Sequence, residues 1–222
     1  MAEIRNSGFE NIFYIDENLC TRNLSPGESV YGEFLYKIDS DEYRYWNPRR
    51  SKLAAMILNG CKTVPITPDT NVLYLGAGTG TTASHVAEIA TKGKIYCIEF
   101  SARAFRDLLT VASRRNNMLP ILESAFYPER YKPLVEKIDV IYQDISQREQ
   151  TRAFIKNAKL FLKPNGQGIY MIKARSIDMT KPPADIFKNE LSQLKLAGFR
   201  ILEQIQLEPY TKDHLGVIVQ FK

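Results

Sequence analysis

The chain has 222 residues, of which 44% are hydrophobic and 25% are charged, and its formal net charge at pH 7 is +5. That size and composition are typical of one folded α/β domain with a small appendage, and they exclude a disordered or fibrous chain. With no apolar run near the roughly 20 residues of a membrane span, no secretion-signal pattern and only three widely spaced cysteines, we expect a reduced, cytoplasmic protein without membrane contact.

The first part of the chain differs in character from the rest. Aromatic and β-branched runs at residues 12–15, 30–36 and 43–46 alternate with turn-forming stretches. This pattern predicts a small N-terminal antiparallel β domain over residues 1–47. Pro48 then interrupts the chain, and residues 51–58 have the apolar spacing of a helix.

Residues 48–222 form the second predicted domain, in which apolar runs alternate with helical patterns. Such alternation is typical of a parallel sheet covered by helices on both faces. The strands expected are 71–75, 95–99, 138–143 and 168–173, and the helices are 81–91, 101–115, 146–161 and 185–197.

The chain ends in two strand patterns, 200–207 and 216–221. The segment between them is too short for a helical crossover, so they must pair antiparallel. A mostly parallel, seven-stranded sheet that ends in an antiparallel hairpin is the Rossmann-like fold of S-adenosylmethionine-dependent methyltransferases, and six of its strands are placed by these patterns.

The apolar run Val72–Leu75 leads into a glycine loop, in which Gly76, Gly78 and Gly80 alternate with Ala77 and Thr79. Glycine adopts positive φ easily and lets the backbone approach a ligand closely. The helix expected from Thr81 would also turn its first amides toward that ligand. A dinucleotide-binding loop has a glycine at the position of Thr81, so the spacing favours S-adenosylmethionine over NAD.

Glu99 stands at the end of the next apolar run, about 20 residues beyond the glycine loop. An acidic side chain at that position can accept hydrogen bonds from both hydroxyls of a ribose. Phe100 could pack on the face of an adenine. The alternative is that Glu99 is only a solvated strand end.

Ionisable residues also follow the other expected strands. Asp144 comes after the run 138–143, Lys173 ends the run 168–173, His214 enters the last strand, and Lys52 lies on the helix before the first strand. Ligands bind beyond the carboxyl ends of parallel strands, so these side chains are expected to converge. Taken singly, Lys52 could be surface decoration, Asp144 a helix cap, and His214 an ordinary turn residue.

The chain resembles the fibrillarins, in particular the short archaeal fibrillarin-like form. The resemblance covers residues 8–222, and this chain lacks the glycine-arginine tail of the eukaryotic members. The matching segments are Glu42–Ala55, Tyr74–Ala77, Gly80–Thr82, Ile98–Phe100, Pro120–Glu123, Val140–Gln147 and Glu208–His214. It implies an RNA ribose 2′-O-methyltransferase that uses S-adenosylmethionine. It also assigns Lys52, Asp144, Lys173 and His214 to the catalytic site.

The resemblance further implies which residues contact the cofactor. They come from the glycine loop and from three strand ends: Gly76, Ala77, Gly78, Gly80, Thr81, Thr82, Glu99, Phe100, Ser124, Ala125, Asp144, Ile145, Ser146 and Gln147. The family commonly has aspartate, which contacts the adenine amino group, where this chain has Ser124. Serine can still accept a hydrogen bond, and weaker cofactor binding is expected.

The implied setting is a box C/D guide ribonucleoprotein acting on ribosomal and transfer RNA. Its other parts are a Nop-domain scaffold protein, a kink-turn-binding protein, a guide RNA and the target rRNA or tRNA. A basic stripe of Arg148, Arg152, Lys156 and Lys159 is a candidate scaffold-docking face, although such a stripe can simply be solvated.

In the mechanism that we expect, Lys173 takes the proton of the 2′-hydroxyl and Asp144 orients Lys173. Lys52 supplies positive charge, and His214 positions the ribose. Two lysines and a carboxylate suit such a step, and no metal is needed. Two other functions stay open: a methyltransferase for protein or small molecules, and a noncatalytic RNA-binding subunit with a vestigial cofactor pocket. An NAD-dependent reductase fits least, because of Thr81 and the terminal hairpin.

Overall fold

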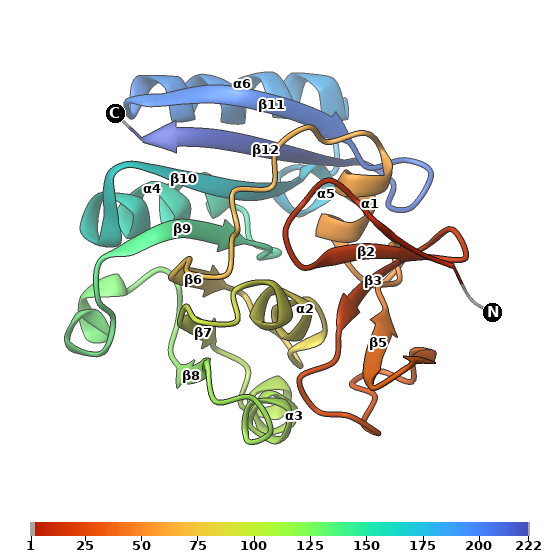
Figure 1. The fold of residues 1–222 in the computed structure, drawn as a ribbon. Helices are drawn as coiled ribbons and strands as arrows, with labels where there is room; N and C mark the ends of the chain where they lie inside the picture. The colour runs from red at the N-terminus through yellow and green to blue at the C-terminus, as the bar shows by residue number, and fades with distance from the viewer. Residues whose placement is uncertain (1–2, 222) are drawn as a thin grey trace.

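A five-stranded antiparallel sheet forms the amino-terminal part of the protein in a computed structural model that describes residues 3–221 (Figure 1). The strand order is β1-β2-β3-β5-β4. The strands are β1 (Ile4–Asn6), β2 (Ile12–Ile15), β3 (Asn18–Arg22), β4 (Leu35–Ile38) and β5 (Asp41–Tyr45).

The sequence patterns located this sheet but placed its strands imperfectly. β1 and β3 were not foreseen, because the hairpin between β2 and β3 turns at Asp16 and Glu17, two non-glycine residues with positive φ. The strand expected at 30–36 was wrong over most of its length. There the chain folds around the carboxylate of Glu33, which accepts hydrogen bonds from the amides of Val30 and Tyr31.

The second sheet has seven strands in the order β11-β12-β10-β9-β6-β7-β8, which confirms the predicted fold class. Its strands are β6 (Val72–Leu75), β7 (Ile95–Glu99), β8 (Met118–Leu122), β9 (Ile138–Gln143), β10 (Leu162–Lys173), β11 (Phe199–Gln206) and β12 (His214–Phe221). The last two strands form the expected antiparallel hairpin, and β12 also pairs antiparallel with β10.

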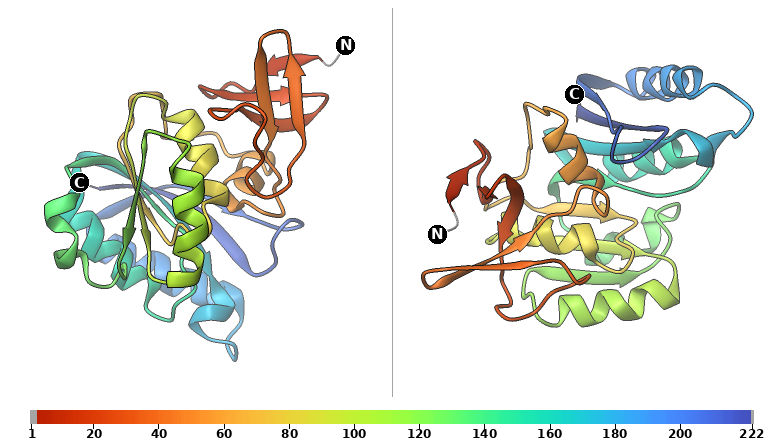
Figure 2. Two further views of the ribbon diagram at one scale, coloured as in Figure 1. Left: turned by 90° about the horizontal axis from the view of Figure 1, so that it is seen from below. Right: turned by 90° about the vertical axis from the view of Figure 1, so that its right-hand side faces the viewer.

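Helices cover both faces of this sheet (Figure 2). α1 (Lys52–Leu58), α2 (Thr81–Ile89) and α3 (Ala102–Ala112) pack on the face that buries Val72 and Tyr74, whereas α4 (Gln150–Phe161) and α6 (Pro183–Leu196) pack on the face that buries Leu73 and Leu75. The alternation along β6 follows from the period of two in a strand. The short helices are η1 (Pro128–Arg130), η2 (Lys132–Leu134) and α5 (Ala174–Ile177).

Three details of the second sheet differ from the sequence prediction. β8 was missed, because Pro120 interrupts its apolar pattern; β8 is an edge strand, where proline is tolerated. The helix expected from residue 146 begins at Gln150, so Arg148 of the basic stripe precedes it. β10 begins six residues earlier than expected, at Leu162.

The strand order reverses between β6 and β9. From β6 the chain proceeds to β7 and β8 on one side, then returns to β9 and continues to β10 on the other. In open α/β sheets the crevice at such a reversal, beyond the carboxyl ends of the strands, is where ligands bind. In this chain, those ends are the glycine loop after β6 and Asp144 after β9.

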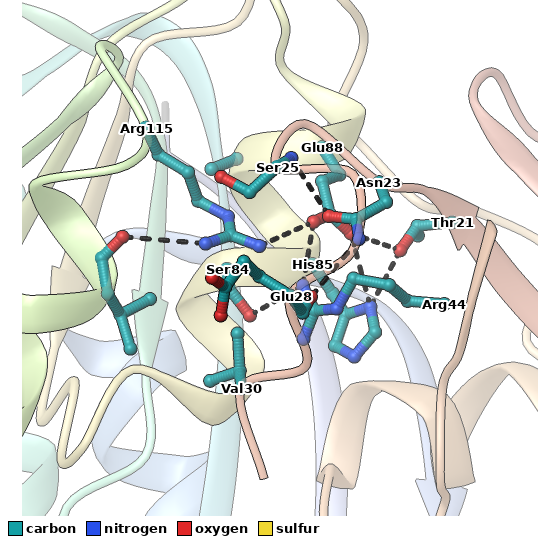
Figure 3. A network of polar contacts seen from close by, with 12 residues as sticks. Thr21, Asn23, Ser25, Glu28, Val30, Arg44, Ser84, His85, Glu88 and Arg115 are labelled. Atoms are coloured by element: carbon teal, nitrogen blue, oxygen red, sulfur yellow. Dashed lines mark hydrogen bonds and ion pairs between the residues drawn. The ribbon is translucent and has the colours of Figure 1, made fainter. Parts of the chain in front are cut away.

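A buried charge network connects the amino-terminal sheet to α2, which packs on the second sheet (Figure 3). Arg44 of β5 donates to Glu33 and to Glu88 of α2, at 2.5 and 2.6 Å. Arg115 and Thr21 donate to the same Glu88 carboxylate. Burial lowers the pKa of Arg44, but the two carboxylates outweigh this and raise it overall. The network therefore packs as paired ions, with one carboxylate of α2 as its centre.

His85 of α2 lies beside this network and is fully buried. It stacks on Trp46, with ring centroids 4.9 Å apart, and its Nε2 lies 2.9 Å from the Tyr31 hydroxyl. Burial holds the pKa of His85 well below its ordinary value, and the cations of Arg44 and Arg115 lower it further. The imidazole is thus a neutral packing element between the amino-terminal sheet and α2.

The predicted division into domains 1–47 and 48–222 stays a prediction, and residues 1, 2 and 222 lie outside the described part of the chain. Among residues 3–221, no helix is both long and apolar enough to cross a membrane. Cys20, Cys61 and Cys97 are buried free thiols, and none of the three forms a disulfide.

We predict that Arg44→Leu lowers the free energy of unfolding by about 3–5 kcal/mol, because it leaves the buried carboxylate of Glu33 without its cation and leaves Glu88 with Arg115 alone. Urea denaturation followed by circular dichroism measures the loss. Arg22→Leu is the matched control on the same sheet, since the Arg22–Asp41 pair is exposed and should contribute less than about 1 kcal/mol. Equal losses in the two variants would contradict the prediction.

The free energy of unfolding should also decrease as the pH falls below about 6.5, the ordinary pKa of histidine. His85 and His214, the two histidines, both have pKa values below that value in the fold. Below it the unfolded chain binds protons that the folded chain does not, so acid favours unfolding. Denaturation at about pH 7.5 and 5.5 measures the change, and His85→Asn should reduce it more than His214→Asn does; an unchanged slope in His85→Asn would refute the assignment.

Candidate active site

The four ionisable residues predicted at strand ends belong to one site. Lys52 is the first residue of α1, Asp144 follows β9, Lys173 ends β10 and His214 begins β12. Lys52 Nζ lies 3.0 Å from Asp144 Oδ2, and Lys173 Nζ lies 2.9 Å from Asp144 Oδ1. Lys52 is therefore not surface decoration, and Asp144 does not cap α4, which begins only at Gln150.

The sequence before Lys52 explains how α1 is placed over the sheet. Ser51 caps the helix by accepting from the amide of Ala54, and Thr82 of α2 donates to the same Ser51 hydroxyl at 3.1 Å. A serine side chain at this cap satisfies one of the free amides of the first turn. The cap thus connects the start of α1 to the helix that follows the glycine loop.

Asp144 is partly buried between the two lysines, with 15% of its side chain exposed. Burial raises the pKa of a carboxyl, but the ammonium groups of Lys52 and Lys173 outweigh this effect and hold the pKa of Asp144 below its ordinary value. Asp144 is therefore an anion that fixes two amines, and it is not a proton donor at neutral pH.

His214 lies opposite Lys173 in the antiparallel ladder between β12 and β10. Its Nδ1 lies 2.6 Å from the carbonyl oxygen of Lys212. Burial lowers the pKa of His214, and the nearby Lys52 and Lys173 lower it further. At neutral pH the ring is uncharged, with one nitrogen held by the backbone of its own turn.

A cavity of about 490 Å³ adjoins this cluster. Ten of the residues predicted to contact a cofactor line it: Gly76, Gly78, Glu99, Phe100, Ser124, Ala125, Asp144, Ile145, Ser146 and Gln147. Ala77, Gly80, Thr81 and Thr82 do not, and Ala77 and Thr82 are buried. The wall consists of the glycine loop, the end of β7 and the loops that follow β8 and β9.

Glu99 is held firmly at the end of β7 and is only 6% exposed. Its Oε2 accepts from the amide of Gly78 and its Oε1 from the amide of Ser101, both at 2.8 Å. Glu99 is not a solvated strand end. Since an ionised carboxylate has about four acceptor positions, each oxygen keeps one for a ligand in the cavity.

The amides of the glycine loop are largely occupied within the protein. Those of Gly76 and Ala77 donate to the carbonyl of Ile98, and that of Gly78 donates to Glu99. Phosphate-binding loops present such amides to the anion. The loop is therefore poorly suited to a pyrophosphate, which argues against a dinucleotide at this cavity.

Gly76 is required for a steric reason. A Cβ at this position would lie 2.7 Å from the carbonyl oxygen of Asp144 and 2.7 Å from Cγ2 of Ile145, and its φ is +80°. Any side chain would push the glycine loop away from the loop after β9. Gly76 thus brings the two walls of the cavity together.

Phe126 and Tyr127, which were not predicted from the sequence, also line the cavity. They follow β8, and the aromatic pair directly after Ala125 was the available signal. It was overlooked because the strand before it was not recognised. The hydroxyl of Ser124 accepts from the amide of Phe126 at 3.3 Å, so its hydrogen is free for another acceptor.

Ser146 contacts the lysine cluster as well as the cavity. Its hydroxyl accepts from Lys173 Nζ at 2.5 Å. Within residues 3–221, no group of three or more His, Cys, Asp or Glu side chains is placed to hold a metal ion. Chemically, the site has two amines and an imidazole beside a small-molecule cavity, and Asp144 and Ser146 belong to both parts.

The Fibrillarin family model matches residues 4–222. A fibrillarin-like rRNA/tRNA 2′-O-methyltransferase of Methanothermobacter thermautotrophicus is 50% identical over 213 residues, covering 96% of this chain and 95% of the relative.

Two solved structures are also similar. Aeropyrum pernix fibrillarin, in complex with natively bound S-adenosyl-L-methionine, has a TM-score of 0.91 and 39% identity and covers 99% of this chain and 100% of its own. The fibrillarin of a fibrillarin/Nop5p complex has a TM-score of 0.89 and 42% identity, covering 96% of this chain and 98% of its own. Because the Fibrillarin family model matches nearly the whole length of this chain, the chain belongs to the fibrillarin family.

Proposed function

We propose that this protein is an S-adenosylmethionine-dependent RNA ribose 2′-O-methyltransferase, the catalytic subunit of a box C/D guide ribonucleoprotein acting on rRNA and tRNA. The observation that carries the proposal is the Lys52–Asp144–Lys173 cluster, whose carboxylate is also part of the cavity wall. The related protein of Methanothermobacter thermautotrophicus is named for the same reaction, and the related Aeropyrum pernix fibrillarin binds the same cofactor.

The cavity residues fit S-adenosylmethionine. The open acceptor positions of Glu99 suit the two ribose hydroxyls, and Phe100, which is 66% exposed at the cavity, offers an aromatic face for adenine. The free hydrogen of the Ser124 hydroxyl suits a ring nitrogen of the base. The volume of about 490 Å³ is within the range of small-molecule sites.

When bound, S-adenosylmethionine supplies a methyl group on an activated sulfonium. The protein must then align the attacking oxygen with that group and remove the proton of the 2′-hydroxyl. Lys173 would first release its ammonium proton to solvent, and its neutral amine would then accept the hydroxyl proton at Nζ. Asp144 and Ser146 hold that nitrogen in place, and Lys52 adds positive charge where the alkoxide develops.

His214 is proposed to position the ribose. It is the cross-strand neighbour of Lys173, and its ring is neutral at the pH of the reaction because burial and two lysines lower its pKa. A neutral imidazole with Nδ1 held by a carbonyl can offer Nε2 as a hydrogen-bond acceptor. It would thus contact the sugar without competing with Lys173 for the charge of Asp144.

Target selection is assigned to partners. We infer a Nop-domain scaffold, in line with the Nop5p complex of the related fibrillarin, and also propose a kink-turn-binding protein and the guide RNA. In the basic stripe, Arg148, Arg152 and Lys159 are exposed, whereas Lys156 donates to the carbonyl of Phe126 beside the cavity. The stripe stays a candidate docking face, and cytoplasmic localisation stays an expectation.

The central test is methyl transfer in a particle reconstituted with scaffold, kink-turn protein and guide RNA. Wild-type protein should methylate the guided 2′-hydroxyl, and Lys173→Ala should lower the rate at least about 10²–10⁴-fold, the usual contribution of a general base. Binding of S-adenosylmethionine, measured by calorimetry, should be retained.

Lys163→Ala is the matched control, because Lys163 lies at the other end of β10 and pairs with the partly exposed Asp139. It should transfer methyl groups at the wild-type rate. Full activity of Lys173→Ala would remove Lys173 from the mechanism, and a particle that methylates metabolites but not RNA would favour the small-molecule alternative.

The ribose-binding role of Glu99 has its own test. Glu99→Gln keeps the shape of the side chain but loses the charge, and one of its two amide contacts becomes repulsive. We expect a loss of about 1.5–3 kcal/mol in binding S-adenosylmethionine, roughly ten- to hundredfold in Kd. Calorimetry measures it, with Glu136→Gln, a surface change at the Lys94 ion pair, as the control; an unaltered Kd in Glu99→Gln would rule out the role.

A further inference from the structure

Strand β10 extends beyond its parallel neighbour. β9 ends at Gln143, which pairs with Tyr170, while β10 continues for three more residues to Lys173. On its other side, β10 remains paired with β12 through Lys173 and His214. The backbone of Lys173 therefore has no strand beside it on the β9 side, where its polar groups would be left without partners.

The side chain of Gln150 occupies that position. Its Oε1 accepts from the amide of Lys173 at 3.1 Å, and its Nε2 approaches the carbonyl oxygen of Lys173 at 3.4 Å. The same Nε2 donates to the carbonyl of Gln147 at 3.0 Å. One carboxamide thus contacts both backbone groups of Lys173 and one residue of the cavity wall.

Gln150 is itself fixed and fully buried. It is the first residue of α4, and its carbonyl accepts from Gln143 Nε2 at 2.8 Å. A buried carboxamide is costly unless its donors and acceptor find partners, and here all of them do. The packing therefore leaves the side chain little freedom to move away from Lys173.

We propose that Gln150 is a positioning residue for methyl transfer. Its carboxamide takes the place of the missing strand beyond Gln143, and so fixes the backbone of Lys173 relative to residues 144–147, which carry the carboxylate and part of the cavity wall. The inference rests on the proposed function, because it concerns the distance between the base Lys173 and the bound methyl donor. Gln150 acts through Lys173 and does not touch the reacting atoms.

The neighbouring Thr151 shows what a purely structural residue of this helix does. Its hydroxyl is buried and contacts Tyr170 and Glu190, at 2.7 and 2.5 Å. Neither contact is with the active-site cluster. Thr151→Val removes a buried hydrogen-bonding group next to Gln150 while leaving the Lys173 backbone untouched, so it is a matched control for loss of stability.

The test uses the reconstituted particle at saturating S-adenosylmethionine. Gln150→Leu keeps a similar volume but removes all three side-chain contacts, and we expect the single-turnover rate to fall roughly a hundredfold, as for a small misplacement of a reacting group. The KM for target RNA should be unchanged, and Thr151→Val should keep the wild-type rate. A wild-type rate in Gln150→Leu, or an equal loss in Thr151→Val, would overturn the inference.

Gln150→Glu gives a readout that a merely structural role would not move. Only the protonated carboxyl has a hydrogen, which it can donate to one of the two carbonyls, and those oxygens and burial raise its pKa. The ratio of the variant rate to the wild-type rate should therefore rise as the pH is lowered. This variant also serves if Gln150→Leu does not fold, and a ratio that is flat with pH would count against the positioning role.

The two proposals fail in different ways. A wild-type particle that does not methylate guided RNA would overturn the proposed function and this inference with it. An active wild-type particle with unaffected Gln150 variants would overturn the positioning role alone. Thermal denaturation of each variant before the assay separates loss of rate from loss of fold.

Discussion

The close approach of Gly76 to the loop after β9 is the constraint on which the whole site depends. A Cβ there would meet the Asp144 carbonyl at 2.7 Å, and the Asp144 amide donates to Leu75 at 3.0 Å. Since the strand order reverses between β6 and β9, the glycine loop and the carboxylate leave the sheet side by side. A larger residue at 76 would separate the wall of the cavity from the group that holds the lysines.

Two carboxylates in this fold each gather two cations, with different consequences. Glu88, which pairs with Arg44 and Arg115, has a side chain with no exposed surface, so its network can only join the amino-terminal sheet to α2. Asp144 keeps 15% of its side chain exposed and pairs with lysines that are 20% and 14% exposed. A cluster of paired ions contributes little net stability, but it holds its side chains in defined positions. Only the exposed cluster can also meet a substrate.

The fold class and most of the cluster around Asp144 were predictable, because parallel strands are continuous apolar runs and ligand sites lie at their carboxyl ends. Residues such as Asp144 and Lys173 can therefore be recognised in the sequence, because they stand at the ends of such runs. Strands that break the pattern did not. β8 contains Pro120, and the turn that leads from β2 to β3 consists of two non-glycine residues with positive φ. Without β8, the aromatic pair Phe126 and Tyr127 had no strand end to mark it.

Some side chains take the place of a backbone hydrogen-bond partner, and such contacts could not be predicted from the sequence. Gln150 resembles any glutamine in the first turn of a helix, and its role follows only from β10 being three residues longer than its ladder with β9. The segment 144–147 is then held from two sides, by Gly76 at its start and by Gln150 at Gln147. Because Asp144 and Ser146 of this segment contact Lys173 and also line the cavity, its backbone sets the position of the Lys173 side chain relative to the cavity.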